Sequence, residues 1–419
     1  MSSTVTRGLD WLERSLKPAV KALYQRPITE VSRVWRRALV RTRFIGITGS
    51  GGKTTTKNLL HAALAGRYAS TRNHDSDNQL YDIARTLMRT GLGTRFCVQE
   101  VGASAPGRFQ SMLALLRPQV GVVTNIGTDH ISAFGSSQAV AAEKTKLIAS
   151  LPSDGIAVLN ADEPLVAAMA GSCRGRVVTY GIENEAQFRG EVVTDRWPQR
   201  LTLRIHHAGQ TILAPTRLLP GYQAGNVLAA VATACSLGVT LEQAVRSISQ
   251  YEPILGGMTE HSTKRGITFI RDDGKAPEWS LHKALQYLAR AEAARKIAVI
   301  GTISDAGRKA NMYRRAVEVA LTAADHVLLV GQRAAAAAPR LRALGGEKLS
   351  VFETVQEAAQ WLRGFARAGD LVLLKGSAGA DHLARLALSI DQDVRCWRAR
   401  CPRGIFCDRC SLVGVPASP

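Results

Sequence analysis

Apolar and polar positions alternate along the chain in the manner of a doubly wound α/β protein. From residue 44 onward, short apolar runs such as FIGIT, RFCVQEV and VGVVTNI are each followed by a longer stretch with apolar residues at helical spacing. Short, continuous apolar runs are typical of strands buried on both faces, and their alternation with helices indicates a parallel sheet. We therefore predict a central α/β domain over residues 43–255.

The pattern changes twice after this sheet. Residues 190–215 alternate polar and apolar positions, which predicts a small antiparallel meander, and two helical stretches, GNVLAAVATACSLG and TLEQAVRSISQY, follow it. A second set of strand–helix units begins near Gly256, with strands such as KIAVIGTI, HVLLVG and DLVLLKGS. The predicted fold class is α/β: a doubly wound central domain with a meander, and a Rossmann-like C-terminal domain over residues 256–394.

The first 42 residues predict one or two short basic helices. Trp11, Leu12, Leu16, Val20 and Leu23 form a helical stripe, which we expect Pro27 to break before a second helix starts near Val31. Such a segment either packs on the rest of the protein, the interpretation that we favour, or makes a peripheral contact with a membrane surface.

The net charge of +20 is the unusual feature of the composition. It favours anionic partners in principle, although arginine-rich usage with solvated side chains explains it more simply, and we do not expect nucleic acid to be a partner. No apolar run reaches the length of a membrane span, and no signal peptide is recognisable, so we expect a cytoplasmic monomer. Part of the charge is clustered at residues Arg33, Arg36, Arg37, Arg41, Arg43, Arg395, Arg398, Arg400, Arg403 and Arg409.

The seven cysteines fall into two groups. Three lie in apolar contexts, where we expect buried thiols: Cys97, Cys173 and Cys235. The other four lie in a basic tail, residues 395–419, with the spacing C-x4-C-x5-C-x2-C: Cys396, Cys401, Cys407 and Cys410. Three interpretations of the tail stay open, namely a zinc site, free thiols on a disordered segment, and redox pairing.

A glycine-rich loop follows the first strand of the central domain. Residues Gly49, Ser50, Gly51, Gly52, Lys53, Thr54 and Thr55 link the strand 44–48 to a helix. Glycines allow backbone N–H groups to surround a phosphate, and the helix N-terminus adds its positive dipole end. Lys53 would neutralise the β- and γ-phosphates and the Thr54 hydroxyl would bind Mg²⁺, although Ile47 occupies the position where the strict motif has glycine. We predict a nucleoside-triphosphate site.

Two further strands end in polar residues that would face the same loop. Glu100 ends the strand RFCVQEV, and Asp129 and His130 follow the strand VGVVTNI. A carboxylate and an imidazole at this edge of the sheet can hold a second divalent ion beside the triphosphate.

Together, these motifs resemble the Mur ligases, which are ATP-dependent amide-bond ligases. The resemblance covers residues 44–390 and rests on GITGSGGKTT, EVGASAPG, TNIGTDH and AEKTKL. It implies an ADP-forming reaction in which a carboxylate takes the γ-phosphate of ATP and the acyl phosphate is then attacked by an amine. It further implies small-molecule acid and amine substrates from cell-wall precursor or specialised peptide metabolism.

The resemblance also implies roles for individual residues. Lys53 would contact the γ-phosphate, Thr54 would bind the first of two Mg²⁺ ions, and His130 would hold the second. Glu100 would also bind the metals. Lys144 falls where the family has a carbamylated lysine that ligates metal; a solvated lysine beside Lys146 is the alternative. The implied nucleotide contacts are those of Asn226, Asp272 or Asp273, and Lys275.

The chain departs from the family pattern in several places. Only about 43 residues precede the phosphate loop, so we expect the usual uridine-diphosphate-linked donor to be in doubt. Met258 stands where the family often has arginine, and DDGKAPEWS replaces the usual Tyr-Asn-Ala-Asn-Pro segment. Two other functions therefore stay open beside the ligase: a catalytically silent nucleotide-binding module that uses its basic ends to bind a partner, and a simple ATPase or kinase.

Overall fold

The computed structural model describes residues 18–74, 76–103, 105–127, 131–304, 311–399, 401 and 406–416. The chain forms two compact units. The first, here called the central unit, holds Lys17–Asp195 and Arg200–Glu252, and the second, the C-terminal unit, holds Arg196–Gln199 and the chain from Pro253 onward. The described part of the tail after residue 395 belongs to the C-terminal unit.

A nine-stranded sheet organises the central unit, in the order β2-β3-β1-β4-β5-β6-β7-β8-β9. The strands from β2 to β7 pair in parallel, and β7, β8 and β9 form the predicted antiparallel meander. The strands are β1 (Arg43–Thr48), β2 (Ser70–Arg72), β3 (Phe96–Glu100), β4 (Val120–Val123), β5 (Ile156–Asn160), β6 (Arg176–Gly181), β7 (Phe188–Thr194), β8 (Thr202–His207) and β9 (Gln210–Pro215).

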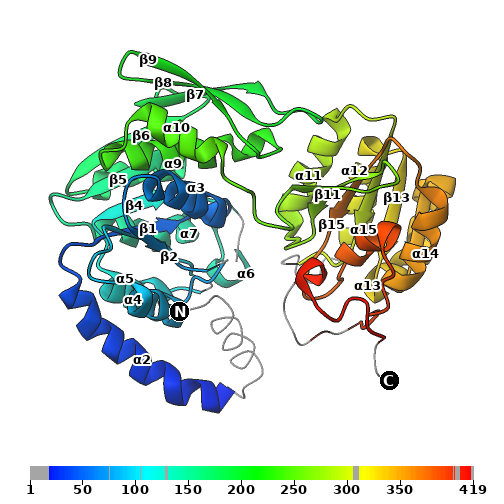
Figure 1. The fold of residues 1–419 in the computed structure, drawn as a ribbon, viewed down its shortest axis with the longest axis horizontal. Helices are drawn as coiled ribbons and strands as arrows, with labels where there is room; N and C mark the ends of the chain where they lie inside the picture. The colour runs from blue at the N-terminus through cyan, green and yellow to red at the C-terminus, as the bar shows by residue number, and fades with distance from the viewer. Residues whose placement is uncertain are drawn as a thin grey trace. The chain divides into compact units, whose positions relative to one another are not determined.

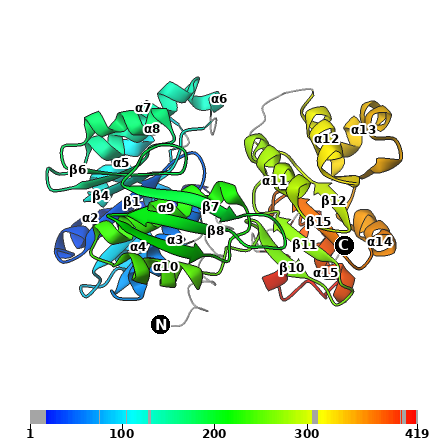
Figure 2. The same ribbon diagram turned by 90° about the horizontal axis from the view of Figure 1, so that it is seen from above.

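Helices cover both faces of this sheet (Figure 1). Figure 2 shows α5, α7 and α8 on one face and α3, α9 and α10 on the other. Each face has its own apolar core, because alternate residues of β1 point in opposite directions: Phe44 joins the first core, and Ile45 joins the second. The helices are α2 (Pro18–Ala38), α3 (Lys53–Ala65), α4 (Leu80–Arg89), α5 (Arg108–Leu116), α6 (Ile131–Phe134), α7 (Ser137–Ala149), α8 (Pro164–Ala167), α9 (Ala224–Ser236) and α10 (Leu241–Ser249), with 3-10 turns at Ala168–Ser172 and Gly221–Gln223.

The basic segment before β1 folds as one helix over its described residues, so the expected break at Pro27 is wrong. Helix α2 runs through Pro27, which lies on the solvent-exposed side of the helix. Proline has no N–H group to donate to the carbonyl of Leu23, four residues earlier, but water can hydrate that carbonyl on the exposed side. The inner face of α2 packs on the protein, as we favoured: the Trp35 indole donates to the carbonyl of Thr90 at 3.0 Å, and Arg36 donates to the carbonyl of Leu116 at 2.7 Å. The stripe at Trp11, Leu12 and Leu16 lies outside the described residues.

The C-terminal unit contains a six-stranded sheet in the order β10-β11-β15-β12-β13-β14, which is parallel except for the edge pair β10–β11. Helices α11, α12 and α13 lie on one face, and α14 and α15 on the other (Figure 2). The strands are β10 (Thr259–Ser262), β11 (Thr268–Asp272), β12 (Arg295–Ile300), β13 (His326–Val330), β14 (Leu349–Phe352) and β15 (Asp370–Lys375). The helices are α11 (Glu278–Arg290), α12 (Met312–Ala323), α13 (Gln332–Gly345), α14 (Val355–Phe365) and α15 (Ala384–Asp391), with 3-10 turns at Gly346–Lys348 and Cys407–Arg409.

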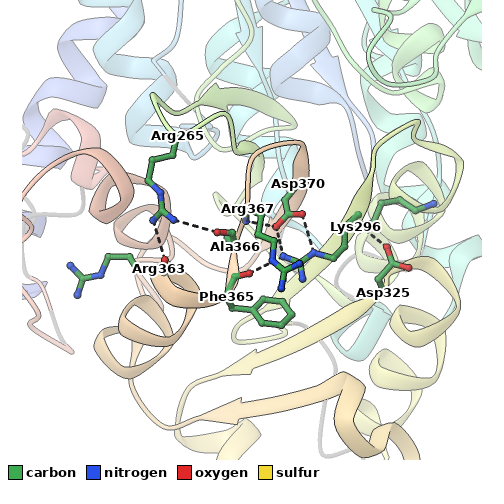
Figure 3. A network of polar contacts seen from close by, with 9 residues as sticks. Arg265, Lys296, Asp325, Arg363, Phe365, Ala366, Arg367 and Asp370 are labelled. Atoms are coloured by element: carbon green, nitrogen blue, oxygen red, sulfur yellow. Dashed lines mark hydrogen bonds and ion pairs between the residues drawn. The ribbon is translucent and has the colours of Figure 1, made fainter.

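An ion pair joins the starts of two neighbouring strands of this second sheet (Figure 3). The Arg295 guanidinium donates to both carboxylate oxygens of Asp370, at 3.0 and 2.6 Å, and to the carbonyl of Phe365 at 2.8 Å. The central carbon of the Arg295 guanidinium (Cζ) lies 4.4 Å from the centre of the Phe365 ring. Because Asp370 is buried, this bidentate pairing compensates the cost of removing its charge from water.

The three cysteines outside the tail are less uniformly buried than expected. Cys97 is buried in a core, whereas Cys173 and Cys235 are half-buried at helix ends and turns. All seven cysteines are free thiols. The described residues therefore contain no disulfide that would support redox pairing in the tail. The tail cysteines are considered again with the site.

Candidate active site

Three loops at one edge of the central sheet form the candidate site. Strand β1 lies between β3 and β4, and all three are parallel, so their carboxyl ends reach the same edge. The phosphate loop follows β1, Glu100 ends β3, and Thr124 and Asn125 follow β4. Ligands of open α/β sheets bind at such an edge. The sequence placed Lys53, Thr54 and Glu100 here, and the structure brings these three together.

Close packing fixes the shape of the phosphate loop. Gly52 has φ 77°, a left-handed conformation, and an added Cβ atom there would lie 2.0 Å from the Oδ1 atom of Asn226 on α9. The Oδ1 atom of Asn226 also lies 3.4 Å from the Thr56 hydroxyl. The loop therefore needs glycine at this position for two reasons, its backbone conformation and the approach of Asn226.

The carboxyl end of β4 holds the loop from the other side. The Oδ1 atom of Asn125 accepts hydrogen bonds from the backbone N–H groups of Ser50 and Gly51, at 3.1 and 2.7 Å. The Ser50 hydroxyl in turn accepts from the N–H of Gly127 at 2.8 Å. Two of the loop's amides thus converge on one oxygen atom, which is the arrangement that a phosphate oxygen also requires.

Lys53 is folded over the loop that precedes it. Its Nζ atom donates to the carbonyl oxygens of Gly49 at 2.8 Å and Ser50 at 3.3 Å. The ammonium charge therefore lies beside the glycines rather than in free solvent. Thr55, the next residue but one, is half-buried in the first turn of α3.

Glu100 is a buried carboxylate with a neighbour at each oxygen. Its Oε2 atom accepts from the Thr54 hydroxyl at 2.7 Å, and its Oε1 atom accepts from the Asn78 amide at 3.0 Å. Asn73 accepts from the Glu100 backbone N–H at 2.9 Å and so fixes the end of the strand. A hydroxyl and a carboxylate this close supply the hard oxygen ligands that Mg²⁺ prefers.

Lys144 is buried on α7, with 4% of its surface exposed, so the alternative of a solvated lysine is wrong. Its neighbour Lys146 has that role instead: it is partly exposed and pairs with Glu143. Glu143 is itself buried and accepts from the backbone N–H groups of Gly107 and Phe109, at 3.0 and 3.3 Å, where α5 begins. Asp129 and His130 lie outside the described residues.

The residues expected to contact the nucleotide from the C-terminal unit lie at the carboxyl end of β11. Asp272 accepts from the Lys375 ammonium group at 2.7 Å, and Lys375 also donates to the carbonyl of Lys275 at 3.0 Å. Burial raises the pKa of Asp272, and the Lys375 charge opposes this rise. Asp273 is buried against Arg271, while the Lys275 side chain is exposed.

Arg271 connects this end of β11 to the tail. Its guanidinium is fully buried and binds Asp273 with two hydrogen bonds of 2.9 Å. Burial raises the pKa of Asp273, and the Arg271 charge opposes this rise. Burial alone would lower the pKa of Arg271, but the charges of Asp273 and Asp408 outweigh it and raise that pKa above its ordinary value.

The tail cysteines do not form a metal centre among the residues that the structure describes. No group of three or more His, Cys, Asp or Glu side chains is arranged to hold a metal ion within those residues. Cys396 and Cys407 are buried, and Cys401 and Cys410 are half-exposed. The described part of the tail is packed on the C-terminal unit, so the interpretation of a disordered segment is wrong there.

Comparison with known proteins agrees with this geometry. A family model described as the Mur ligase middle domain matches residues 47–234, and one described as the Mur ligase, glutamate ligase domain, matches residues 258–378. A UDP-N-acetylmuramoyl-tripeptide–D-alanyl-D-alanine ligase from Mycobacterium tuberculosis (strain CDC 1551 / Oshkosh) is 31% identical over 383 residues, which are 85% of this chain and 74% of that protein. The chain belongs to the Mur ligase family.

Other members of the Mur ligase family give the same result. The Bacillus subtilis protein of the same name is 28% identical over 342 residues, 81% of this chain and 74% of its own length. Among solved structures, MurF from Acinetobacter baumannii superposes with a TM-score of 0.78 at 23% identity, covering 87% of this chain and 80% of that one. MurF from Thermotoga maritima in complex with ADP gives a TM-score of 0.73 at 20% identity, with coverages of 87% and 82%. These structures confirm the predicted α/β fold.

Sequence reasoning missed several residues that shape this Mur ligase site. Asn125 lies within the TNIGTDH motif and Asn73 in a polar segment after β2, and neither position by itself indicates a role. Lys375 and Arg271 each pair with one of the two expected nucleotide carboxylates. The position of Lys375 at the end of a strand, in the segment KGS, was the available signal.

We predict that Gly52→Ala disrupts the phosphate loop, and Gly107→Ala is the matched control. Both glycines are left-handed, with φ near 77° and 79°, but an added Cβ at Gly107 meets no atom within 4 Å. Strain alone should cost each variant about 1–2 kcal/mol of unfolding free energy, which chemical denaturation measures. Only Gly52→Ala should also lose ADP binding, because Asn226 must move. Equal ADP affinity in both variants would contradict this role of Gly52.

Proposed function

We propose that this Mur ligase joins the carboxylate of a muramoyl-linked peptide to D-alanyl-D-alanine, with ATP converted to ADP and phosphate. The names of the most similar curated relatives support the two substrates. The observation that carries the proposal is the meeting of the phosphate loop with Glu100: the Thr54 hydroxyl lies 2.7 Å from its carboxylate at the end of the neighbouring strand. A Mur ligase needs such a site to bring two anions together.

The oxygen atoms of Thr54 and Glu100 fit Mg²⁺, which Mur ligases typically use with ATP. Both are hard ligands, and Asn78 holds the second carboxylate oxygen in place. When bound, the ion draws off charge from the phosphate oxygens and so eases attack by an anion. We assign Thr54 and Glu100 to the first ion, and His130 with Lys144 to the second.

Lys53 and the loop amides supply the remaining positive charge. In the first step, a carboxylate oxygen of the acid attacks the γ-phosphorus and the bond to ADP breaks. In the second step, the amine nitrogen attacks the acyl carbon, phosphate leaves, and the amine loses a proton. Lys53 binds and orients the phosphate in both steps, because phosphoryl transfer depends on positioning and electrostatic stabilisation.

We also assign nucleotide contacts to Asn226, Asp272, Asp273 and Lys275. The positions of Asn226 beside Gly52, and of the two aspartates at the end of β11, support this assignment. The silent-module alternative is not favoured, because the relatives of this chain are named ligases. We keep the boundaries 1–42, 43–255, 256–394 and 395–419 as proposed parts of the chain, and a monomer as its proposed state. The seven free thiols support a cytoplasmic location.

The decisive experiment supplies ATP, Mg²⁺ and D-alanyl-D-alanine with a muramoyl tripeptide, in one arm linked to uridine diphosphate and in another free of it. Mass spectrometry should detect a product one condensation heavier, with one phosphate released per product. Lys53→Ala should reduce turnover by at least about a thousandfold, and exposed Lys264→Ala should not. ATP hydrolysis without a condensation product in either arm would reject the ligase and favour an ATPase.

We propose that the buried Lys144 carries a carbamate, which would turn its cation into an anionic metal ligand. Its burial is consistent with this, because a lysine with no role beyond solvation would be exposed on the helix. Lys144→Ala should lose turnover. The control, Lys146→Ala, replaces a lysine two residues further along α7 and should retain turnover. With ¹³C-bicarbonate, the wild-type protein should show a carbamate NMR signal that Lys144→Ala lacks. A wild-type spectrum without that signal would refute the modification.

We propose that the outer face of α2 makes the peripheral contact with an anionic membrane surface. Leu23, Val31 and Val34 are 76%, 54% and 67% exposed on this face, and Arg26 and Arg37 of the same helix are also exposed. No helix within the described ranges is long and apolar enough to span a bilayer.

Vesicle co-sedimentation tests this contact. The wild-type protein should bind vesicles that contain phosphatidylglycerol, less so at high salt, and should not bind pure phosphatidylcholine. Replacing Val31 and Val34 by Ser should reduce binding about fivefold. The same change at Val192 and Val193, exposed on β7, is the control. Equal binding by both double variants would show that α2 is not the contact.

A further inference from the structure

The described part of the tail returns to pack beside α15 (red in Figure 1). The backbone N–H groups of Arg395 and Cys396 both donate to the carbonyl of Val413, at 2.9 and 3.0 Å, so the two ends of the tail are tied together. Cys407 is buried in a small core with Ala384 and Leu388 of α15. The tail is therefore an integral layer of the C-terminal unit.

Two buried arginines of the C-terminal unit depend on this tail. Arg385 donates to the carbonyl of Arg398 at 2.8 Å, and to the sulfur atoms of Cys407 and Cys396 at 3.4 and 3.9 Å. Arg385 is 1% exposed and Arg271 is fully buried. A buried guanidinium without partners is strongly unfavourable, so both side chains favour the docked tail.

Asp408 gives the tail its specific link to the candidate nucleotide residues. Its carboxylate accepts from Arg271 at 2.7 and 3.2 Å, while the same guanidinium donates to both oxygens of Asp273. Arg271 thus lies between one carboxylate of the tail and one of the loop after β11. Two carboxylates fix the plane of the guanidinium, and that plane fixes the carboxylate of Asp273.

The side chain of Phe406, also in the tail, contacts the same loop after β11. An added Cβ at Gly256 would lie 2.6 Å from its ring, and one at Gly274 would lie 3.6 Å from it. The ring therefore packs over Gly274, within the segment DDGKAP that lacks the larger residues usual in the family. The N–H of Gly274 also donates to the carbonyl of Gly256 at 2.9 Å.

We propose that the tail positions the nucleotide-binding loop of the C-terminal unit, with Asp408 acting through Arg271 on Asp273 and Phe406 packing over Gly274. The tail supplies from a distant part of the sequence the packing that Gly274 and Ala276, which have little or no side chain, do not supply. This proposal rests on the proposed nucleotide role of that loop. Asp408 is a positioning residue and touches no substrate.

Asp408→Asn in the full-length protein tests the proposal. The amide keeps the size of the side chain but removes the charge, so Arg271 loses its second anionic partner. The dissociation constant for ADP and the KM for ATP should rise about five- to tenfold, while kcat at saturating ATP stays within about twofold. Hydrogen exchange in the peptide 268–276 should become faster. Asp408→Glu, which keeps the charge, should recover part of the affinity.

Asp393→Asn is the matched control, because Asp393 lies near the tail, is exposed, and pairs with the exposed Arg395. It should leave ADP affinity unchanged. Phe406→Ala, at a half-buried position, is the second variant should Asp408→Asn fail to fold, and it too should weaken ADP binding. A lower melting temperature or faster exchange with unchanged ADP affinity would overturn the proposal, since the tail would then be only structural.

The two proposals fail in different ways. A wild-type protein that binds ADP but forms no condensation product loses the ligase function, while the effect of Asp408→Asn on ADP affinity still decides the role of the tail. A wild-type protein that forms product with equal ADP affinity in Asp408→Asn keeps the function and loses the positioning role. A wild-type protein that binds no ADP contradicts both.

Discussion

The hydrogen bond between Thr54 and Glu100 joins the first turn of α3 to the end of β3, and the candidate chemistry depends on it. A buried carboxylate is costly unless its oxygens are satisfied, and here a hydroxyl and an amide satisfy one each. The sheet order makes this possible, because β3 and β1 are parallel neighbours in register. The candidate site for a metal and a triphosphate thus lies where the fold has to satisfy a buried carboxylate, and the proposed reaction would need the same oxygen atoms as ligands.

The C-terminal unit satisfies its buried charges in a different way. Asp272 pairs with Lys375 from the adjacent strand, whereas Asp273 pairs with Arg271 from its own strand and so becomes linked to Asp408. The two aspartates are consecutive in sequence but belong to separate networks. Within the Mur ligase family, where this loop is expected to meet the nucleotide, one carboxylate here is held by the sheet and the other by the tail.

The sequence predicted the parts of the fold that periodicity controls. Strand β1, the helix that follows it and the meander β7–β9 were predicted because buried strands and half-buried strands leave different patterns. Strands β6 and β10 were missed. The edge strand β10, TEHS, is polar and carries no apolar period, and β6, RVVTYG, has exposed and half-buried positions among its buried ones. The continuity of α2 through Pro27 was missed because it depends on which side of the helix faces solvent, and that is decided by packing.

The candidate site was predictable where the backbone itself specifies the chemistry. Gly52 and Lys53 could be assigned from sequence, since a glycine loop before a helix has few other uses. The partners Asn125 and Asp408 could not, because they lie 75 and 137 residues from the groups that they contact. The burial of Lys144 was equally invisible, since α7 shows no clear amphipathic pattern around it.

The contact of Asn125 with the phosphate loop makes ligand entry an exchange. The amides of Ser50 and Gly51 already share one carbonyl oxygen, so any phosphate oxygen that reaches them competes with a partner held at high effective concentration by the fold. The free energy of anion binding is then the free energy of the new hydrogen bonds less that of the Asn125 hydrogen bonds that they replace. An anion with a single contact would then lose that competition, whereas a polyphosphate that gains further contacts elsewhere in the loop would win it.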